Sequence, residues 1–387
     1  MLTESGVMLP KSRKIIIRAV SVARSICFVQ PFLESLKDNY DVRLLSSPGD
    51  ELTRICDEYS VAGYPIRMNR RFSPIRDFVS LVKLITLFYR EKPDMVHSMT
   101  PKAGLLCMIA AWVTRVPKRV HTFTGLVWPT SRGIKRVILM LTDKITCFCS
   151  THIIPEGQGV LNDLHQCITQ KPMRVLGNGN IKGVDLSYFR RSPEIEVKST
   201  DIRKDNIYTF IFVGRLVGDK GINELIKAFE KLNSKYVNSR LILVGRFEKE
   251  IDPVANDAIL TIRSNSAIEF VGPKYKDELL AYYAASDCFV LPSYREGFPN
   301  TVLEAGAMGL PCIVTDINGS REIIENGYNG IVVPPKDVDS IYKAMEYIMN
   351  NHDIACKMAA NARPLIEQRF DQRFVCQCLL DFYQEIL

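Results

Sequence analysis

The stretch that decides the fold spans residues 289–316 and reads FVLPSYREGFPNTVLEAGAMGLPCIVTD. Two short apolar runs, at 289–291 and 310–315, predict buried strands of a parallel sheet. Between these runs, Asn300 suits a helix N-cap and Gly309 suits the position just after a helix end. The stretch therefore predicts a strand, a loop, a short helix and a second strand, which is the repeating unit of an α/β fold.

Two carboxylates surround the start of this predicted helix. Glu296 lies in the loop, and Glu304 lies one turn into the helix. A helix that begins beyond the carboxyl end of a parallel strand points its unpaired N–H groups into the crevice where α/β sheets bind ligands, which makes an anion site. Carboxylates repel phosphate but accept hydrogen bonds from sugar hydroxyls. Together these features suggest a nucleotide sugar, which has hydroxyls on both sides of its diphosphate.

This stretch resembles a known family of enzymes. Glu296 and Glu304 reproduce the E-x7-E pattern of the retaining glycosyltransferases of family 4, and residues 296–316 resemble that family throughout. The alternative for two glutamates at this spacing is a solvated helix face. The resemblance covers nearly the whole chain and implies the GT-B fold, in which two doubly wound, Rossmann-like α/β domains face each other across a cleft. It implies an acceptor-binding domain at 1–185, a donor-binding domain at 205–365, and a crossover helix at 366–387 that packs on the first domain.

Composition supports a globular protein of two domains. The chain has 387 residues, of which 47% are hydrophobic and 24% are charged. Eleven cysteines lack paired metal-ligand spacing, so we expect reduced thiols. The N-terminus lacks the apolar core of a signal peptide, and the longest apolar stretches are too short to span a bilayer. These features predict a cytoplasmic protein.

Charge is distributed unevenly along the chain. Residues 1–180 carry 25 Lys and Arg against 14 Asp and Glu, whereas the remainder carries 25 against 29. A basic first half favours an anionic partner, such as a membrane surface, an anionic acceptor or nucleic acid. The sequence shows no helix-turn-helix, RNA-binding or zinc-finger pattern, so we expect no nucleic-acid partner.

The segment at 67–92 reads RMNRRFSPIRDFVSLVKLITLFYREK and mixes basic with apolar residues. One interpretation of Arg70–Arg76 is a basic amphipathic segment that lies on anionic lipid. The other is a core helix with a solvated basic face, and the sequence does not separate the two. After Val79 the pattern favours a core helix. The first interpretation predicts peripheral contact with the anionic inner face of the cell membrane, made by the arginines of this segment.

The predicted strands of the first half end in polar residues. Strands are expected near 14–19, 41–46, 60–66, 93–98, 120–123 and 150–156, with a helix near 26–36 after the first. The acceptor-side candidates at these strand ends are Ser21, His97, Lys102, His121, Thr124, Gly125 and Glu156. Family members often place a histidine immediately before the glycine of the loop that follows 120–123. This chain has Thr124 there, and His121 cannot simply take over the role of that histidine.

The second half begins after an expected polar linker at 190–206. A strand at 208–213 feeds the segment GRLVGDKGINELIKAFEKL, which is neither a dinucleotide fingerprint nor a Walker loop. Arg215 and Lys220, at the carboxyl end of this strand, are suited to a diphosphate whose negative charge grows as the sugar leaves. The segment resembles the family's GRL-x3-KG donor loop. Family members hold the nucleobase by backbone contacts at the position of Gly272, after a strand at 268–271.

The resemblance implies a reaction and a set of site residues. The reaction is transfer of a hexose or N-acetylhexosamine from a nucleoside-diphosphate sugar, expected to be UDP-linked, with retention of configuration. The expected acceptor is a polyprenyl-diphosphate-linked saccharide of surface polysaccharide synthesis. Glu296, Arg215 and Lys220 are the implied catalytic residues. The implied donor-binding residues are Gly214, Arg215, Lys220, Gly272, Glu296, Gly297, Phe298, Pro299, Asn300, Thr301 and Glu304.

No obligatory metal or other cofactor is expected. Asp337-Val338-Asp339 matches the D-x-D pattern of metal-dependent transferases, but it opens a predicted helix, so helix capping is the better interpretation. Three other classes are compatible with parts of the pattern. A nucleotide-sugar epimerase shares the architecture, a nicotinamide dehydrogenase would need the missing dinucleotide fingerprint, and a lectin or membrane-binding module would bind without releasing UDP.

Overall fold

The computed structural model describes residues 13–69, 73–248 and 252–387. The chain divides into two compact units. The first unit contains the described residues up to Glu156, together with Leu161–Leu176 and Cys376–Leu387. The second unit contains Gly157–Val160 and Gly177–Val375. Each unit is an α/β body with its own parallel sheet, as the sequence predicts.

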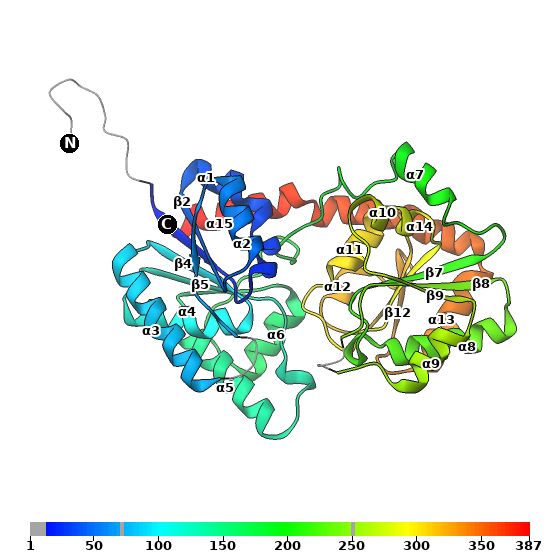
Figure 1. The fold of residues 1–387 in the computed structure, drawn as a ribbon, viewed down its shortest axis with the longest axis horizontal. Helices are drawn as coiled ribbons and strands as arrows, with labels where there is room; N and C mark the ends of the chain where they lie inside the picture. Colours follow the sequence, from blue (N-terminus) through cyan, green and yellow to red (C-terminus); the bar gives the residue numbers. More distant parts are fainter. Residues whose placement is uncertain (1–12, 70–72, 249–251) are drawn as a thin grey trace. The chain divides into compact units, whose positions relative to one another are not determined.

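The first unit is built on a six-stranded sheet with the order β3-β2-β1-β4-β5-β6 (Figure 1). Its strands are β1 (Ile15–Ala19), β2 (Asp41–Ser46), β3 (Ala62–Pro65), β4 (Met95–Met99), β5 (Lys118–Phe123) and β6 (His152–Pro155). All neighbouring strands pair in parallel. The order reverses between β1 and β4, which is the topological switch point of a doubly wound sheet.

Helices cover both faces of the first sheet. They are α1 (Leu33–Asn39), α2 (Asp50–Tyr59), α3 (Pro74–Glu91), α4 (Pro101–Val113), α5 (Gly133–Cys149), α6 (Gln158–Cys167) and α15 (Gln372–Ile386). On one face, α4 packs between α3 and α5 (Figure 1). On the other face, Tyr383 of α15 is fully buried and its hydroxyl lies 2.5 Å from Nδ1 of His97 in β4. The C-terminal residues therefore complete the core of the first unit.

The prediction of one continuous helix near residues 26–36 is wrong in detail. The chain instead forms two short 3₁₀ helices, η1 (Ala23–Phe28) and η2 (Gln30–Phe32), before α1 begins at Leu33. Pro31 has no N–H to donate, so an α-helix that ran through it would lose a backbone hydrogen bond. The turn after β1 therefore has no long helix N-terminus.

The second unit repeats the same topology. Its strands are β7 (Tyr208–Val213), β8 (Ser239–Val244), β9 (Ile268–Gly272), β10 (Cys288–Leu291), β11 (Cys312–Thr315) and β12 (Gly330–Val333). They form a parallel sheet with the order β12-β11-β10-β7-β8-β9, so the switch point lies between β7 and β10. β8, β10 and β11 are buried along their whole length, because helices cover both faces.

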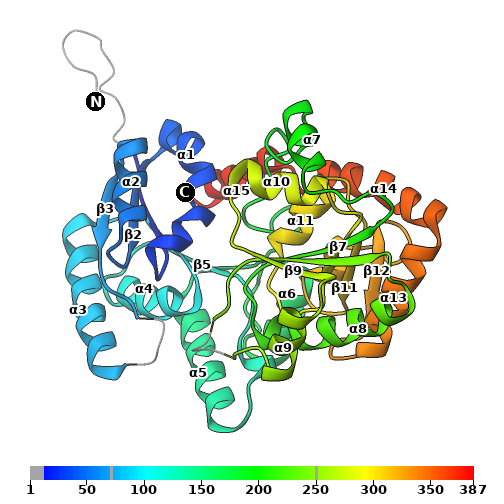
Figure 2. The same ribbon diagram turned by 45° about the vertical axis from the view of Figure 1, so that its right-hand side comes forward.

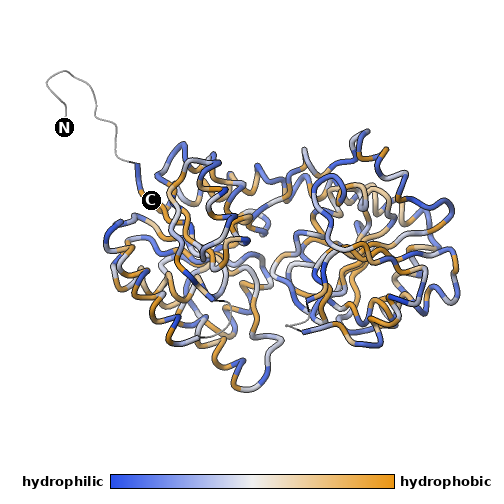
Figure 3. The backbone as a smooth tube through the Cα atoms, in the orientation of Figure 1, coloured by the Kyte–Doolittle hydropathy of each residue, from blue (hydrophilic) through white to orange (hydrophobic). Residues whose placement is uncertain are grey.

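The helices of the second unit lie in two layers. They are α7 (Pro193–Thr200), α8 (Ile222–Lys235), α9 (Asn256–Ser264), α10 (Lys276–Ala284), α11 (Asn300–Ala307), α12 (Ser320–Ile323), α13 (Val338–Asn350) and α14 (His352–Phe370). Figure 2 shows α8, α9 and α13 on one side of the sheet and α10, α11 and α14 on the other. In Figure 3, apolar residues follow the strands through the middle of each unit.

The expected linker at 190–206 contains a helix. Residues Pro193–Thr200 form α7, and the Ser192 hydroxyl caps it by accepting the N–H of Ile195 at 3.4 Å. Ile195 is buried against the core of the second unit. Ser192 followed by Pro193 is a typical helix start, and the polar composition of the segment concealed it.

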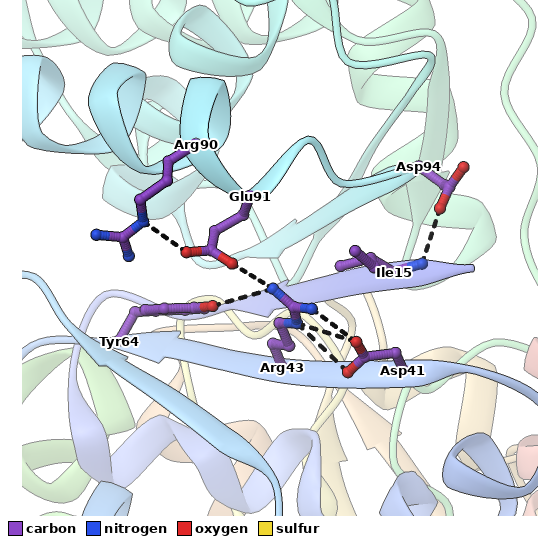
Figure 4. Close-up of polar contacts among 7 residues, drawn as sticks. All are labelled: Ile15, Asp41, Arg43, Tyr64, Arg90, Glu91 and Asp94. Atoms are coloured by element: carbon purple, nitrogen blue, oxygen red, sulfur yellow. Dashed lines mark hydrogen bonds and ion pairs between the residues drawn. The ribbon is translucent and has the colours of Figure 1, made fainter. Parts of the chain in front are cut away.

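A polar network ties the amino ends of the first strands together. Figure 4 shows its members, which are Ile15, Asp41, Arg43, Tyr64, Arg90, Glu91 and Asp94. Arg43 of β2 donates to Asp41 at 2.7 Å, to the Tyr64 hydroxyl of β3 at 3.2 Å, and to Glu91 at the end of α3. Asp94, just before β4, accepts the N–H of Ile15 at 2.8 Å. The hydrogen bond from Arg90 lowers the pKa of Glu91, which keeps this carboxylate ionised for its bond to Arg43.

No helix among the described residues combines the length and the apolar character that crossing a bilayer needs.

Candidate functional site

The loops at the switch point of the second sheet hold the predicted donor residues. The β7 loop (214–221) follows β7, and the β10 loop (292–299) follows the neighbouring strand β10. The Tyr294 N–H donates to the carbonyl of Asp219 at 2.8 Å, and Arg295 pairs with the Asp219 carboxylate at 2.9 Å. The two loops are therefore fastened to each other at the place where open α/β sheets bind ligands.

Gly221 sets how closely the two loops approach. It has a φ of +70°, and a Cβ atom there would lie 2.0 Å from the carbonyl oxygen of Pro292. An L-amino acid would have to adopt an unfavourable backbone conformation and push Pro292 away. Glycine at this position lets α8 begin directly against the carboxyl end of β10.

Lys220 and Glu296 face each other across the two loops. The Lys220 ammonium donates to Oε1 of Glu296, and the Ser293 hydroxyl donates to the same oxygen at 2.7 Å. Both charged side chains are largely buried, with 17% of Lys220 and 13% of Glu296 exposed. An ammonium has three donors, so Lys220 can hold Glu296 and still donate to an anionic ligand.

Arg215 has a different carboxylate partner. Its guanidinium pairs with Glu248 at 2.6 Å, and 41% of its side chain is exposed. Glu248 follows β8, and the Leu216 N–H donates to the carbonyl of Arg246 at 2.9 Å, which joins the β7 loop to the loop after β8. Glu248 was not predicted as a site residue. Its position just beyond the carboxyl end of a strand next to β7 was the available signal.

The start of α11 differs from the sequence prediction. Pro299, not Asn300, is the N-cap residue, and its carbonyl accepts the N–H of Val302 at 3.1 Å. Asn300 is the first helical residue, and its side-chain oxygen accepts a bond from Asn180 at 3.0 Å. The prediction of Asn300 as N-cap is therefore wrong, because this side chain binds a neighbouring loop rather than the helix's own N–H groups. Gly309, with a φ of +76°, follows the helix end as predicted.

The backbone before α11 packs against the next loop. A Cβ atom at Gly319, which follows β11, would lie 2.3 Å from the carbonyl oxygen of Gly297. Phe298 is buried, and its ring lies 5.4 Å from that of Phe370. The structure thus brings Gly297, Phe298, Pro299, Asn300 and Thr301 together with Lys220 and Glu296 at one edge of the sheet.

Glu304 lies one turn into α11 and is half-buried. Its Oε2 accepts a hydrogen bond from the Tyr283 hydroxyl of α10 at 3.2 Å. Burial raises the pKa of the Glu304 carboxyl, whereas the positive charge of Lys182 and the bond from Tyr283 lower that pKa.

Two further predicted donor residues lie at the ends of neighbouring strands. Gly214 follows β7, and its N–H donates to the carbonyl of Val244 at 3.0 Å. Gly272 ends β9 with a φ of +72°, and its carbonyl accepts the Gly245 N–H at 3.0 Å. An added Cβ at Gly272 would contact none of the described atoms within 4 Å.

The acceptor-side candidates of the first unit fall into two groups. Ser21, Lys102, Thr124, Gly125 and Glu156 follow β1, β4, β5 and β6, so they lie at the carboxyl edge of the first sheet. The Ser21 hydroxyl accepts a bond from Thr100 at 3.0 Å, and Lys102 pairs with Asp77 at 2.5 Å. Their roles toward an acceptor stay predictions.

His97 and His121 lie inside β4 and β5 and are each 1% exposed. Nε2 of His97 lies 2.7 Å from the Thr122 hydroxyl, and Nδ1 of His121 lies 2.8 Å from the Ser98 hydroxyl. Burial lowers the pKa of His121 to about 3, so its ring is neutral at physiological pH. In this structure both rings contribute to packing within the first unit and do not reach its surface.

The D-x-D segment acts as a helix cap. Asp337 is the N-cap of α13, and its carboxylate accepts the Ser340 N–H at 3.1 Å. This agrees with the interpretation from the sequence. Across the part of the chain that the structure describes, no group of three His, Cys, Asp or Glu side chains is placed to hold a metal ion.

Comparison with known proteins identifies the family. The model for "Glycosyl transferases group 1" matches residues 194–364, and the model for "Glycosyl transferase 4-like" matches residues 19–151. The capsular polysaccharide biosynthesis glycosyltransferase CapM of Staphylococcus aureus is 33% identical over 384 residues, which are 97% of this chain and 98% of that protein. An Escherichia coli UDP-Gal:alpha-D-GlcNAc-diphosphoundecaprenol alpha-1,3-galactosyltransferase is 28% identical over 347 residues, 86% of each chain.

Solved structures show the same architecture. The Anabaena protein HepE in complex with UDP-glucose superposes with a TM-score of 0.79 at 18% identity, over 96% of this chain and 99% of that one. A sucrose-phosphate synthase from Thermosynechococcus elongatus gives a TM-score of 0.80 at 17% identity, over 97% and 99% of the two chains. The chain therefore belongs to the group 1 glycosyltransferases, the family 4 type that its sequence resembles, and it has their GT-B fold.

Proposed function

We propose that this glycosyltransferase moves a hexose or N-acetylhexosamine from a UDP-sugar to a saccharide carried on a polyprenyl diphosphate, with retention of configuration. The name of the E. coli relative specifies a UDP-sugar donor and a diphosphoundecaprenol acceptor, and that of the S. aureus relative specifies capsular polysaccharide. A Campylobacter jejuni relative, 24% identical over 382 residues, is also named for a diphospho-undecaprenol acceptor. These names support surface polysaccharide synthesis as the process.

The observation that carries the proposal is the Lys220–Glu296 pair beside the start of α11, at the switch point of the second sheet. In the proposed complex the diphosphate lies between Lys220 and the first N–H groups of α11. Both stabilise the negative charge that grows on the diphosphate as the sugar leaves. Glu296, held by Lys220 and Ser293, accepts bonds from hydroxyls of the transferred sugar.

The proposal gives the remaining donor residues the roles that the family resemblance implies. Arg215 is half-exposed beside Glu248. When the donor binds, the Arg215 guanidinium turns toward the diphosphate and donates hydrogen bonds to two of the diphosphate oxygens. Glu304 accepts bonds from the ribose hydroxyls. Gly297, Phe298 and Pro299 shape the backbone near the transferred sugar, and Gly272 offers backbone contacts to the base.

Retention follows from attack on the same face as the departing diphosphate. The acceptor oxygen forms a bond to the anomeric carbon as the bond from that carbon to the diphosphate oxygen breaks. The acceptor proton passes to the departing diphosphate oxygen, so charge and atoms balance. This route needs no nucleophilic side chain, and Lys220 acts on the oxygen that accumulates charge.

The test is sugar transfer by the purified protein to a synthetic polyprenyl-diphosphate N-acetylhexosamine. A panel of UDP-hexoses and UDP-N-acetylhexosamines is offered, UDP release is measured, and the new linkage is assigned by NMR. We expect one preferred donor and an anomeric configuration that matches that donor. Glu296→Gln should lower kcat by at least about tenfold, since it removes the negative charge that holds Lys220 and replaces one of the two acceptor oxygens for sugar hydroxyls by an NH2 donor.

The matched control is Glu325→Gln, a change in an exposed carboxylate that pairs with Arg369 at 3.4 Å. This variant should transfer sugar at the wild-type rate. An inverted linkage would overturn retention. Interconversion of nucleotide sugars without any acceptor would favour the epimerase alternative.

We also propose that the first unit binds an anionic membrane surface through α3 and α5. On α3, Ile75, Phe78 and Val79 are 82%, 66% and 48% exposed, and on α5, Ile134 and Val137 are 80% and 65% exposed. Exposed basic residues, Arg76, Lys83, Arg132, Lys135 and Arg136, lie among them. The exposed apolar residues lie in the N-terminal halves of helices that follow β3 and β5, so they lie toward the carboxyl edge of the sheet.

The helix after Val79 is therefore only partly a core helix. Leu84, Leu87 and Phe88 are buried, as predicted, but Val79 and Val82 are about half exposed. Arg70 and Arg71, on which the sequence-based lipid prediction also rested, lie outside the described residues. An apolar face with basic residues around it fits a surface of anionic lipid headgroups.

Membrane binding should depend on this face. Ile134→Ser with Val137→Ser should weaken flotation on vesicles containing phosphatidylglycerol by about tenfold or more, because each buried aliphatic side chain contributes about 1.5–3 kcal/mol. The control pair, Val237→Ser with Leu260→Ser, changes residues of the second unit that are 85% and 65% exposed. Equal flotation of both double variants would rule out the α5 face as the contact.

A further inference from the structure

The loop at 178–184 carries a buried asparagine that contacts the start of α11. Both the loop and α11 belong to the second unit. Asn180 is 3% exposed and has a φ of +59°, a left-handed conformation that asparagine adopts more readily than most residues. One side-chain atom of Asn180 accepts the backbone N–H groups of Lys182 at 2.9 Å and Gly183 at 2.6 Å. The other side-chain atom lies 3.0 Å from the side chain of Asn300, the first residue of α11.

These contacts determine how both side-chain amides are oriented. The oxygen of an amide only accepts hydrogen bonds and its nitrogen only donates them, so the partners distinguish the two atoms. Two backbone N–H groups point at one atom of Asn180, so that atom is the oxygen and the nitrogen faces Asn300. The atom of Asn300 that receives this nitrogen must then be its oxygen. The NH2 group of Asn300 is therefore directed away from Asn180.

The side-chain nitrogen of Asn300 remains a hydrogen-bond donor for a ligand. Among the residues that the structure describes, none accepts a bond from it. The Asn300 side chain is half-buried at the first turn of α11, and the first backbone N–H groups of a helix have no partner within it. Lys220 and Glu296 lie at the same edge of the second sheet. The start of α11 thus offers a side-chain donor in addition to its backbone donors.

The position of α11 does not depend on Asn180 alone. Arg363 donates to the carbonyl of Ala307, the last residue of α11, at 2.6 Å. Arg191 donates to the carbonyl of the next residue, Met308, at 3.0 Å. Two guanidinium groups therefore hold the C-terminal end of the helix, whose last carbonyls have no partner within it. A change at Asn180 that keeps the loop intact should consequently alter the amide at the helix start without moving α11.

We propose that Asn180 is a positioning residue of the donor site: it holds the Asn300 amide so that the Asn300 nitrogen donates to an oxygen of the nucleotide sugar's diphosphate. The inference rests on the proposed position of that diphosphate at the start of α11. An N–H group that donates to a phosphate oxygen forms a charge-assisted hydrogen bond, which is stronger than a bond between neutral groups. If the amide were reversed, its oxygen would face the phosphate oxygens and repel them. Asn180 thus selects the orientation that favours an anion.

The experiment reverses the Asn300 amide by a change in its partner. In Asn180→Asp, one carboxylate oxygen still accepts the two backbone N–H groups, while the other faces Asn300, whose amide turns its nitrogen toward that oxygen. We expect the affinity for UDP, measured by calorimetry without acceptor, to fall by about tenfold or more, as for the loss of a hydrogen bond to a charged group. The affinity for uridine, which has no phosphate, should stay unchanged. Asn300→Asp, which leaves Asn180 and its loop intact, should weaken UDP binding to a similar extent, and thermal melts establish that each variant is folded.

Two controls separate this effect from that of the added negative charge. Asn350→Asp makes the same change at the last residue of α13, which donates to the Tyr236 hydroxyl at 3.0 Å, and this variant should bind UDP as the wild type does. In the Asn300→Ala background, Asn180→Asp should cause no further loss of UDP affinity, because the amide through which it acts is absent.

Three outcomes would overturn the inference. Unchanged UDP affinity in Asn180→Asp would mean that the orientation of the Asn300 amide does not matter to the ligand. A further loss in the Asn300→Ala background would mean that the new charge acts on the ligand directly. Equal losses of affinity for UDP and uridine would give Asn180 a purely structural role in its loop. Failure of the donor site itself is distinguishable, because Lys220→Ala would then bind UDP as tightly as the wild type.

Discussion

Replacing Lys220 by alanine should lower kcat for sugar transfer by about 10²- to 10³-fold, the size of effect seen when a preorganised group that stabilises transition-state charge is removed. The variant loses the ammonium at the oxygen where negative charge develops. It also leaves Glu296, only 13% exposed, without its cation beside the incoming diphosphate. The effect should fall mainly on kcat, because the charge on the leaving oxygen is greatest in the transition state.

The measurement is steady-state release of UDP with donor and acceptor both varied. Lys227→Ala is the matched control, because Lys227 is a lysine of the adjacent helix α8 that is half-exposed and pairs with Asp257 at 3.4 Å. It should keep the wild-type kcat. In the double variant Lys220→Ala with Glu296→Gln, the unpaired charge is gone, so its loss should be smaller than the product of the two single losses. If kcat of Lys220→Ala fell by less than about fivefold, Lys220 would not be one of the catalytic residues.

Gly221→Ala should lower the free energy of unfolding of the second unit by roughly 3 kcal/mol, which combines an unfavourable positive φ with a clash against backbone. The added Cβ would lie 2.0 Å from the carbonyl oxygen of Pro292. A main-chain atom at the end of β10 cannot rotate away as a flexible side chain could. For a unit of about 200 residues, this corresponds to a fall in Tm of roughly 6–12 °C.

Gly309→Ala provides the comparison. Gly309 has a φ of +76°, close to that of Gly221, but an added Cβ would meet nothing within 4 Å among the described atoms. This variant should lose only about 1 kcal/mol, the cost of the backbone conformation. Thermal melts of the two variants separate conformational strain from steric contact. Equal Tm values would mean that the β7 and β10 loops can move apart without cost.

Much of the fold could be predicted from the sequence, because parallel strands that are buried on both faces leave a clear signal. The runs at Asp41–Ser46 and Tyr208–Val213 were predicted with the bounds that the structure has. Such strands are short, apolar and bounded by turn residues. The helices were harder, since their ends depend on individual caps. Pro31 broke one predicted helix, and Ser192 with Pro193 started another inside a polar segment.

Those residues of the candidate site that directly follow the ends of strands could be predicted from the sequence. Lys220 and Glu296 follow β7 and β10, and the rule that ligands bind at a switch point brings such residues together. Asn180 and Glu248 were missed because their contacts, with Asn300 and Arg215, depend on how loops fold back on the sheet edge. The binding partner of Asn300 could not be predicted either, because an asparagine at a helix start can accept from its own helix or from another loop.

The division of the chain into units also has a consequence for synthesis. The first unit includes Cys376–Leu387, and the buried Tyr383 of that segment completes the packing around His97. The second unit ends at Val375, so all its residues leave the ribosome before Tyr383 does. The first unit is therefore translated first but has its core completed last. Tyr383 cannot pack on His97 of β4 until the rest of the protein has been made.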